Sequence, residues 1–312
     1  MDKEEKMEEK IVKIPSNDGE NMLAVHCFLP EAPCAVVQVV HGMAEHIGRY
    51  SRFAKRLNEE GIALIGHDHL GHGLTAKSDE DLGFFAKVNG ADLLVKDAMN
   101  VTKYIKDTFD LPVVLFGHSM GSLVSRNYIS RNSSLLEGCI LSGNVQDTVL
   151  LSKQICNLAA AVKGEREVSD AVNKMAFLTY QMEYAHPRTP FDWLSRDEAE
   201  VDKYINDKYC GFDFTSWAMR DVAELNYNVS GKKWIESIDK DLPIYLFSGE
   251  KDPCGGWGRG VKRIYERMKN AGIKKVSLKL YPECRHELLN ELNREEITED
   301  MVKAVKEILE GA

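Results

Sequence analysis

Apolar residues along the chain form two alternating patterns: short runs rich in valine, isoleucine and leucine, and longer stretches with helical periodicity. The short runs predict strands, and several are apolar at nearly every position, as in parallel sheets buried on both faces. The predicted strands are 11–14, 22–28, 35–40, 62–66, 113–116, 139–143, 243–248 and 276–281. A turn-forming cluster at 16–19 separates the first two runs, which predicts a hairpin.

Helical stretches follow most of these strands. We expect helices over about 49–60, 89–109, 258–270 and 294–309, and another directly after Gly121. Strands and helices that alternate in this way are typical of an α/β fold, in which helices flank a mostly parallel central sheet.

The alternation is interrupted between residues 146 and 240, where no convincing strand pattern occurs. Helical patterns lie near 148–163, 168–183, 195–208 and 215–229. We therefore predict a core of residues 1–145 and 241–312, with residues 146–240 inserted as a helical cap.

Composition excludes several classes of function. Of the 312 residues, 44% are hydrophobic and 29% are charged, which is ordinary for a globular protein. The net charge of −9 argues against a nucleic-acid partner. No apolar run approaches the ~18 residues that a membrane-spanning helix needs. The charged start of the chain does not resemble a secretory signal.

The seven cysteines are dispersed and include no Cys-x-x-Cys pair. An odd, scattered set predicts reduced thiols and a cytoplasmic protein, because disulfides form in oxidising compartments. For the same reason we do not expect a zinc site.

The stretch 117–121 carries the first candidate chemistry. It reads Gly-His-Ser-Met-Gly and lies between the predicted strand 113–116 and a helix. This context matches the nucleophile elbow, in which a serine occupies a sharp strand-to-helix turn and glycines allow strand and helix to approach closely. We predict that Ser119 is a nucleophile, exposed at the carboxyl edge of the sheet.

A serine nucleophile needs a base, and the base needs an orienting acid. In proteins with this elbow the chain order is Ser, then Asp or Glu, then His. Asp252 and His286 follow two late strands, so both should lie at the edge of the sheet where Ser119 stands. We predict a triad of Ser119, Asp252 and His286, with Glu250 as the competing acid.

An oxyanion hole needs two backbone N–H groups that point at the developing negative charge. The residue after the nucleophile, Met120, should supply one. The loop after strand 35–40 should supply the other, and we assign it to Met43, because Gly42 lets the backbone approach closely.

Histidines are concentrated near this loop. They are His41, His46, His67, His69 and His72. The spacing His-x-His-x-Asp-His of a binuclear metal site is absent, so we expect no metal. These side chains should instead join the loops around the oxyanion hole by hydrogen bonds.

One helical stripe in the predicted cap suggests a binding surface. Leu151, Ile155, Leu158 and Val162 recur at the spacing of one helix face. An insert at this point of the fold returns above Ser119, so we predict that the stripe lines or opens an acyl tunnel. The same apolar surface would allow transient contact with a membrane. Ordinary core packing is the alternative interpretation.

The motifs together resemble a known family. Residues 41–50 resemble the H-G-x-x-E-H-x-x-R-Y signature of monoglyceride lipases and lysophospholipase-like hydrolases. Residues 66–73 are similar to their G-x-D-H-x-G-H-G loop, and residues 117–121 match their G-H-S-M-G elbow. The resemblance implies an α/β-hydrolase fold, a helical cap, no cofactor and hydrolysis of monoacyl lipids. Ser122 is a departure, since another glycine is frequent there.

We therefore predict a serine carboxylester hydrolase that acts on monoacylglycerol or lysophospholipid through an acyl-enzyme intermediate. An alternative is the same triad acting on other acyl substrates, such as short-chain esters, aromatic-acid esters or thioesters. An aminopeptidase is less favoured, because those enzymes carry H-G-G-P-G where this chain has His41-Gly42-Met43-Ala44. A non-catalytic binding protein with the same fold is the alternative from another class. The acyl chain length, the head group and the oligomeric state are not determined by the sequence.

Overall fold

The computed structural model describes residues 8–147, 150–181, 184 and 187–311, built around a sheet of eight strands in the order β1-β2-β4-β3-β5-β6-β7-β8. The strands are β1 (Glu8–Pro15), β2 (Met22–Leu29), β3 (Ala35–Val40), β4 (Ile62–His67), β5 (Val113–His118), β6 (Gly138–Ser142), β7 (Ile244–Gly249) and β8 (Val276–Tyr281). Strand β2 is antiparallel to both of its neighbours, and all other neighbouring strands are parallel.

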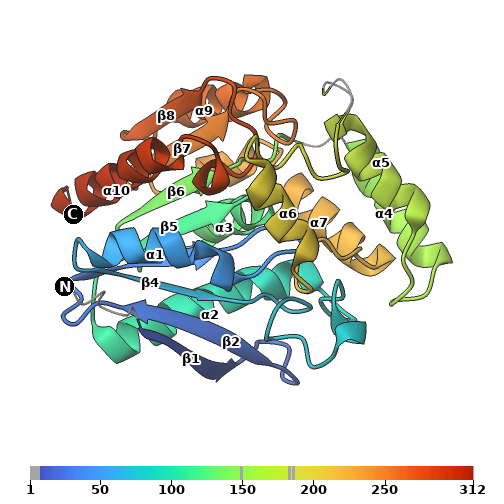
Figure 1. Cartoon of the computed structure of the whole chain (residues 1–312), viewed down its shortest axis with the longest axis horizontal. Coiled ribbons are helices and arrows are strands. Elements are labelled where there is room, and N and C mark those ends of the chain that lie inside the picture. The colour runs from blue at the N-terminus through green and yellow to red at the C-terminus, as the bar shows by residue number, and fades with distance from the viewer. Residues whose placement is uncertain (1–7, 148–149, 182–183, 185–186, 312) are drawn as a thin grey trace.

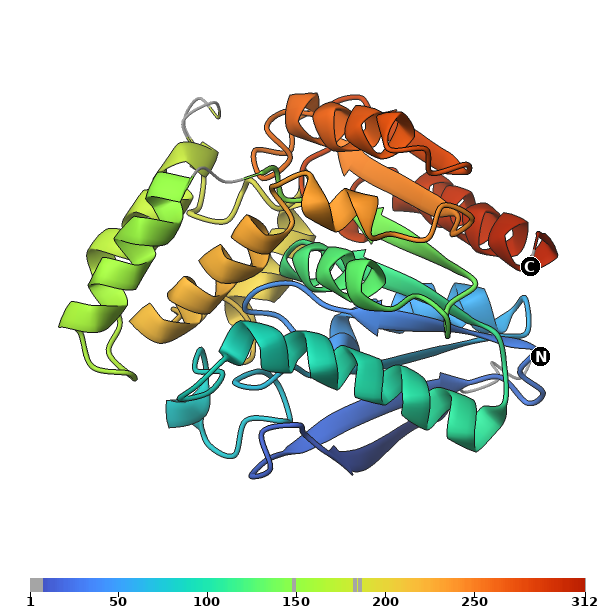
Figure 2. The same ribbon diagram turned by 180° about the vertical axis from the view of Figure 1, so that it is seen from behind.

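Helices cover both faces of the sheet (Figures 1 and 2). One face carries α1 (Ser51–Asn58) and α10 (Arg294–Glu310). The other face carries α2 (Gly90–Phe109), α3 (Met120–Arg131) and α9 (Arg259–Asn270). The central strands are apolar on both sides, so each layer of helices buries its own hydrophobic core against the sheet.

Between β6 and β7, the described residues form helices and no strand, apart from an isolated β-bridge between Val168 and Thr215. The helices are α4 (Leu150–Val162), α5 (Asp170–Gln181), α6 (Glu198–Asn206), α7 (Ser216–Asn228) and α8 (Lys233–Glu236). Figures 1 and 2 show α4 and α5 as a pair set apart from the sheet. Leu225, Trp234 and Ile238 pack in the same hydrophobic cluster as α2 and α3, and Cys156 of α4 and Val172 of α5 also reach this cluster. The later part of the insert is therefore packed like core, and the boundary at residue 240 stays a prediction.

The observed elements confirm the predicted fold class, a mostly parallel sheet with flanking helices. The sequence patterns missed α8 and the short 3₁₀ helices η1 (Ile47–Tyr50), η2 (Asp79–Asp81) and η3 (Leu288–Asn290). Elements this short span about one turn and show no periodicity. Among the helices of the described residues, none combines the length and the apolar content needed to cross a membrane.

Candidate active site

Ser119 lies between β5 and α3 with a strained backbone, at φ 54° and ψ −119°. This left-handed φ is uncommon for a residue other than glycine and marks the sharp turn of the predicted elbow. A Cβ at Gly121 would collide with the carbonyl of Val40, and one at Gly117 would collide with the hydroxyl of Ser125. The two glycines therefore let α3 pass directly over β3 and β5, which holds the Ser119 turn in place.

His286 and Asp252 form a buried hydrogen-bonded pair at the same edge of the sheet. Nδ1 of His286 donates to Oδ1 of Asp252 at 3.0 Å, and the backbone N–H of Cys254 donates to the same oxygen at 2.8 Å. The two side chains are 2% and 0% exposed, whereas Glu250 is exposed. Nε2 of His286 has no hydrogen-bond partner among the described residues, so the neutral ring can accept a proton there.

Two neighbouring histidines have pKa values shifted in opposite directions. Burial is the largest influence on His286 and lowers its pKa, but the Asp252 carboxylate and the neighbouring Cys254 together outweigh it and raise the pKa above the ordinary value. Burial and the neighbouring His286 lower the pKa of His118 to about 4. The rings of His118 and His286 lie 4.9 Å apart. A proton that enters this site therefore resides on His286, while His118 stays neutral.

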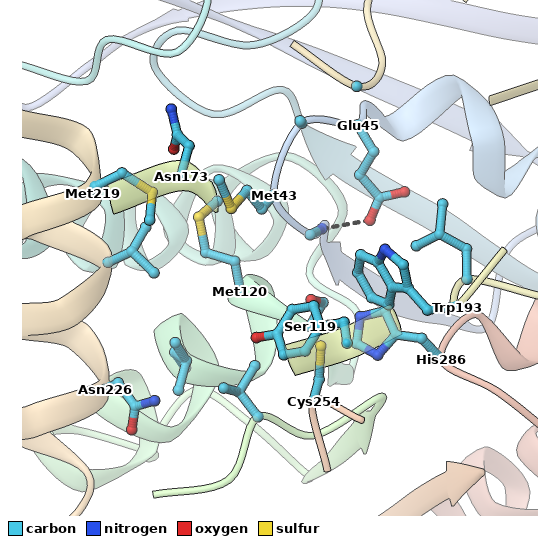
Figure 3. A pocket seen from close by; sticks show the side chains of 18 of the residues that line it. Met43, Glu45, Ser119, Met120, Asn173, Trp193, Met219, Asn226, Cys254 and His286 are labelled. Atoms are coloured by element: carbon cyan, nitrogen blue, oxygen red, sulfur yellow. Dashed lines mark hydrogen bonds between the residues drawn. The ribbon is translucent and has the colours of Figure 1, made fainter. Parts of the chain in front are cut away.

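The loop after β3 lies against the elbow. A Cβ at Gly42 would be 3.1 Å from the Cβ of Ser119, and the N–H of Gly42 donates to Oε1 of Glu45 at 2.5 Å. Met43 and Met120 both line the cavity in front of Ser119 (Figure 3). Met120 is the first residue of α3, where no intrahelical carbonyl can accept its N–H. Both predicted oxyanion-hole residues are thus brought beside Ser119.

Most of the clustered histidines join loops, as predicted. His41 accepts from the N–H of His69 at 3.0 Å, and His72 accepts from the N–H of Ala44 at 3.2 Å. His69 in turn contacts the carbonyl of His41 at 3.2 Å. His67 differs, because it is buried and neither ring nitrogen has a partner among the described residues. These contacts confirm that His41, His69 and His72 join the loop after β3 to the loop after β4.

A buried ion-pair network beneath the site was not assigned any role from the sequence. Arg49 donates to Oε2 of Glu45 at 2.9 Å and, through both terminal nitrogens, to the two carboxylate oxygens of Glu287 at 2.6 Å. Burial raises the pKa of Glu287, but Arg49 more than offsets it and lowers the pKa to about 2. Glu45 belongs to the oxyanion loop and Glu287 follows His286, so Arg49 joins the two. The i, i+4 spacing of Glu45 and Arg49 was the available signal.

The insert also contacts the loop that carries His286. The carbonyl of Leu194 accepts from the N–H of Glu287 at 2.7 Å. The Trp193 ring lies 5.0 Å from the His286 ring and, in Figure 3, stands beside it. Neither residue belonged to a motif, and only the fold shows that the insert supports the His286 loop.

A cavity of about 1010 Å³ opens in front of Ser119, and its lining includes both Ser119 and His286. Its apolar lining residues include Met43, Met120, Leu123, Val172, Trp193 and Met219. Such a space, apolar with a few polar groups at one place, is typical of a small-molecule site.

The predicted α4 stripe only partly reaches this cavity. Ile155 belongs to its lining. Leu158 and Val162 do not, and they are 67% and 76% exposed. The side chain of Leu151 lies outside the described residues. Leu158 and Val162 therefore do not line the cavity in this structure, because the described residues leave this end of the helix face exposed, and a role in opening the tunnel stays a prediction.

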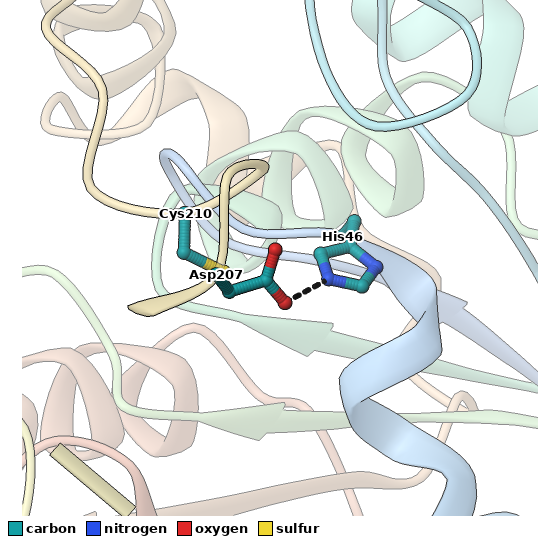
Figure 4. Close-up of side chains that lie close together, drawn as sticks. All are labelled: His46, Asp207 and Cys210. Carbon is teal, nitrogen blue, oxygen red and sulfur yellow. Dashed lines mark hydrogen bonds and ion pairs between the residues drawn. The ribbon is translucent and has the colours of Figure 1, made fainter. Parts of the chain in front are cut away.

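Two groups of potential metal ligands occur within the described residues. One consists of Asp252 and His286 with Cys254, and so coincides with the pair described above. The other consists of His46, Asp207 and Cys210, and joins the start of η1 to the segment after α6 (Figure 4).

Comparison with known proteins agrees with this geometry. The family described as serine aminopeptidase, S33, matches residues 31–293. Human monoglyceride lipase is 33% identical over 284 residues, which cover 88% of this chain and 82% of that protein. A carboxyl esterase from Bacillus coagulans, solved in complex with glycerol, has a TM-score of 0.89 at 27% identity, covering 97% of this chain and 99% of its own.

A more distant structure shares the fold. It is a soluble variant of monoglyceride lipase from Saccharomyces cerevisiae, with a TM-score of 0.74 at 17% identity over 97% of this chain and 96% of its own. The family match extends over most of the core and all of the insert, from before β3 to beyond His286. The chain therefore belongs to the serine aminopeptidase, S33, family of α/β-hydrolase enzymes.

Proposed function

We propose that the protein hydrolyses monoacylglycerols or lysophospholipids, with Ser119, His286 and Asp252 as its catalytic triad. One observation carries the proposal: the strained Ser119 turn and the His286–Asp252 pair open into the same large, mostly apolar cavity. A triad needs these groups together, and an acyl chain needs such a cavity, where burial contributes about 0.8 kcal/mol per methylene.

The chemistry follows from the protonation states. Nε2 of His286 accepts the Ser119 proton as Oγ attacks the ester carbonyl, and the resulting imidazolium is stabilised by Asp252. His286 then gives this proton to the leaving alcohol, which leaves an acyl group on Ser119. In the second half, His286 takes a proton from water, the hydroxide formed attacks the acyl carbonyl, and Ser119 is released with its proton restored.

The proposed oxyanion hole consists of the N–H groups of Met43 and Met120. The N-terminus of α3 adds a favourable dipole at the same position. Glu45 accepts from the Gly42 N–H and from the Tyr50 hydroxyl, at 2.5 Å and 2.9 Å, which supports a fixed loop conformation before substrate arrives.

A monoacyl glycerol ester is the favoured substrate class. The relatives named above are lipases and an esterase, and one of them was solved with glycerol. The family description names aminopeptidases, but Glu45 and Glu287, two of the carboxylates that line the cavity, are already paired with Arg49. They are therefore not free to bind the ammonium group of a peptide N-terminus.

The exposed part of α4 supports brief contact with a lipid surface. Leu158 and Val162 stand on the insert that covers the cavity, and an interface could bury both side chains. A cytoplasmic location stays a prediction from the sequence.

Labelling with a fluorophosphonate probe, combined with a panel of substrates, tests the proposal. We expect a single adduct on Ser119, and faster hydrolysis of long-chain monoacylglycerols or lysophospholipids than of aromatic-acid esters and thioesters. Absence of the adduct would favour a binding protein. An adduct on Ser119 together with a preference for short or aromatic esters would support the proposed triad but contradict the proposed substrate class.

A further inference from the structure

We propose that His46, Asp207 and Cys210 form a zinc site that joins the core to the insert. Figure 4 shows the three side chains converging from two segments that are far apart in sequence. The site lies outside the groups that carry out ester hydrolysis, so the inference does not depend on the proposed substrate.

The ligand atoms already lie close to a zinc geometry. Nε2 of His46 is 2.9 Å from Oδ2 of Asp207, and the ligand atoms of all three residues lie within 4.8 Å of one another. Tetrahedral zinc, with bonds of ~2.0–2.3 Å, holds its ligand atoms roughly 3.3–3.7 Å apart. To admit the ion, His46 and Asp207 would separate by well under 1 Å, and Cys210, within 4.8 Å of both, would move closer by no more than about 1.5 Å. A water molecule would complete the fourth position.

The donor set favours zinc over harder cations. One thiolate, one imidazole and one carboxylate match the sulfur, nitrogen and oxygen ligands of zinc, whereas magnesium and calcium prefer oxygen alone. The side chains of His46 and Asp207 are 17% and 32% exposed, so an ion can arrive from solvent. Cys210 is buried.

Zinc binds the thiolate form of cysteine. Formation of the Zn–S bond to Cys210 therefore breaks its S–H bond and releases the proton to solvent.

The backbone around the site is already ordered. The N–H of Tyr209 donates to Oδ1 of Asp207 at 2.9 Å, and the N–H of Cys210 donates to the Asp207 carbonyl at 3.0 Å. Ala44 accepts from the Gly211 N–H and the Tyr204 hydroxyl, both at 3.0 Å. Since Ala44 follows Met43, zinc would hold the insert against the loop that carries a proposed oxyanion N–H.

Titration of the full-length, reduced protein with Zn²⁺ tests this proposal, using calorimetry for affinity and thermal unfolding for stability. We expect one ion per chain and a higher unfolding temperature. In Cys210→Ser the affinity for Zn²⁺ should fall at least tenfold, and zinc should raise the unfolding temperature less. Asp207→Asn should have the same effects, and because it keeps the size of the side chain it serves as the test if the serine variant folds poorly. Co²⁺ should give a thiolate charge-transfer absorption that Cys210→Ser removes.

Two control variants separate this site from others. Cys254→Ser alters the ligand group at the proposed triad, and Cys34→Ser removes an exposed thiol. Zinc binding that survives both controls and is lost in Cys210→Ser supports the proposal. Binding that is unchanged in Cys210→Ser and Asp207→Asn, or that disappears only in Cys254→Ser, overturns it.

Discussion

On the core side of the cavity, Ser119, His286 and the Gly42 loop are held by buried partners, whereas α4 on the insert side presents Leu158 and Val162 to solvent. The core side combines backbone strain, short hydrogen bonds and a buried ion-pair network. Such features fix the positions of reacting groups to a fraction of an ångström, as catalysis requires. A helix packed mainly by apolar contacts can shape a cavity without that precision. The comparison predicts that substitutions on the two sides change different measurable quantities.

The largest effect should come from Ser119→Ala. Removal of the proposed nucleophile should lower ester turnover by ~10³-fold or more, while the unfolding temperature changes little. Turnover of a monoacylglycerol and thermal unfolding measured on the same preparation check this. Asp252→Asn should also be severe and Glu250→Gln mild. The reverse order would reassign the acid of the triad.

The second-largest effect should be a loss of stability of the core side in acid. Burial lowers the pKa of His67, His72 and His118 to about 4, while the unfolded chain takes up protons below ~6.5. The stability that these neutral rings contribute is therefore present above pH 6.5 and lost progressively as the pH falls towards 4. Chemical denaturation between pH 7 and 4 measures the loss. His67→Leu should make the free energy of unfolding depend less on pH, because it removes one of the titrating rings. It breaks no hydrogen bond among the described residues, since neither nitrogen of His67 has a partner there. An unchanged pH dependence would contradict the role of His67.

The pKa of His286 is shifted in the opposite direction to those three, so its effects on stability and activity have the opposite pH dependence. Its raised pKa means that the folded protein holds a proton to higher pH than the unfolded chain, so this residue contributes stability below pH ~6.5 that is lost as the pH rises through its folded pKa. Because only the neutral ring accepts the Ser119 proton, kcat/KM should increase with pH through the same range. A pH–rate profile that is flat around and above neutrality would contradict this role.

Arg49→Met tests the ion-pair network. It leaves Glu45 and Glu287 buried without a counter-ion, which should cost about 3–5 kcal/mol of folding stability and lower kcat more than it raises KM. Arg52→Met is the matched control, because Arg52 pairs with Glu200 at a side chain that is 45% exposed. There we expect about 0–1 kcal/mol. Equal losses in both variants would remove any special role for Arg49.

The smallest effect on stability should come from the insert. Leu158→Ser with Val162→Ser should change the free energy of unfolding by about 0.5 kcal/mol or less, since both side chains are exposed. Hydrolysis on lipid vesicles should slow, and hydrolysis of dissolved short esters should not. Ile155→Ala, which alters the cavity lining, should instead raise KM for long-chain esters in both settings. Loss of stability in the double variant would place this helix face in the core.

Local patterns in the sequence predicted the strands, the principal helices and the turn at Ser119, because periodicity and glycine placement act over a few residues. The order Ser, Asp, His also predicted that Asp252 and His286 would pair at the edge of the sheet where Ser119 stands, since parallel strands bring their carboxyl ends to one edge. Helical periodicity identified the apolar face of α4 but not what covers it, so only the structure showed Leu158 and Val162 exposed.

Tertiary structure alone decided the contacts between distant segments. Arg49 meets Glu287 across 238 positions, and His46 meets Asp207 across 161. Dispersed cysteines argued against zinc, yet the fold places Cys210 beside His46 and Asp207. Ion pairs and metal sites depend on distance in space, which the order of residues does not encode until the core and the insert have packed together.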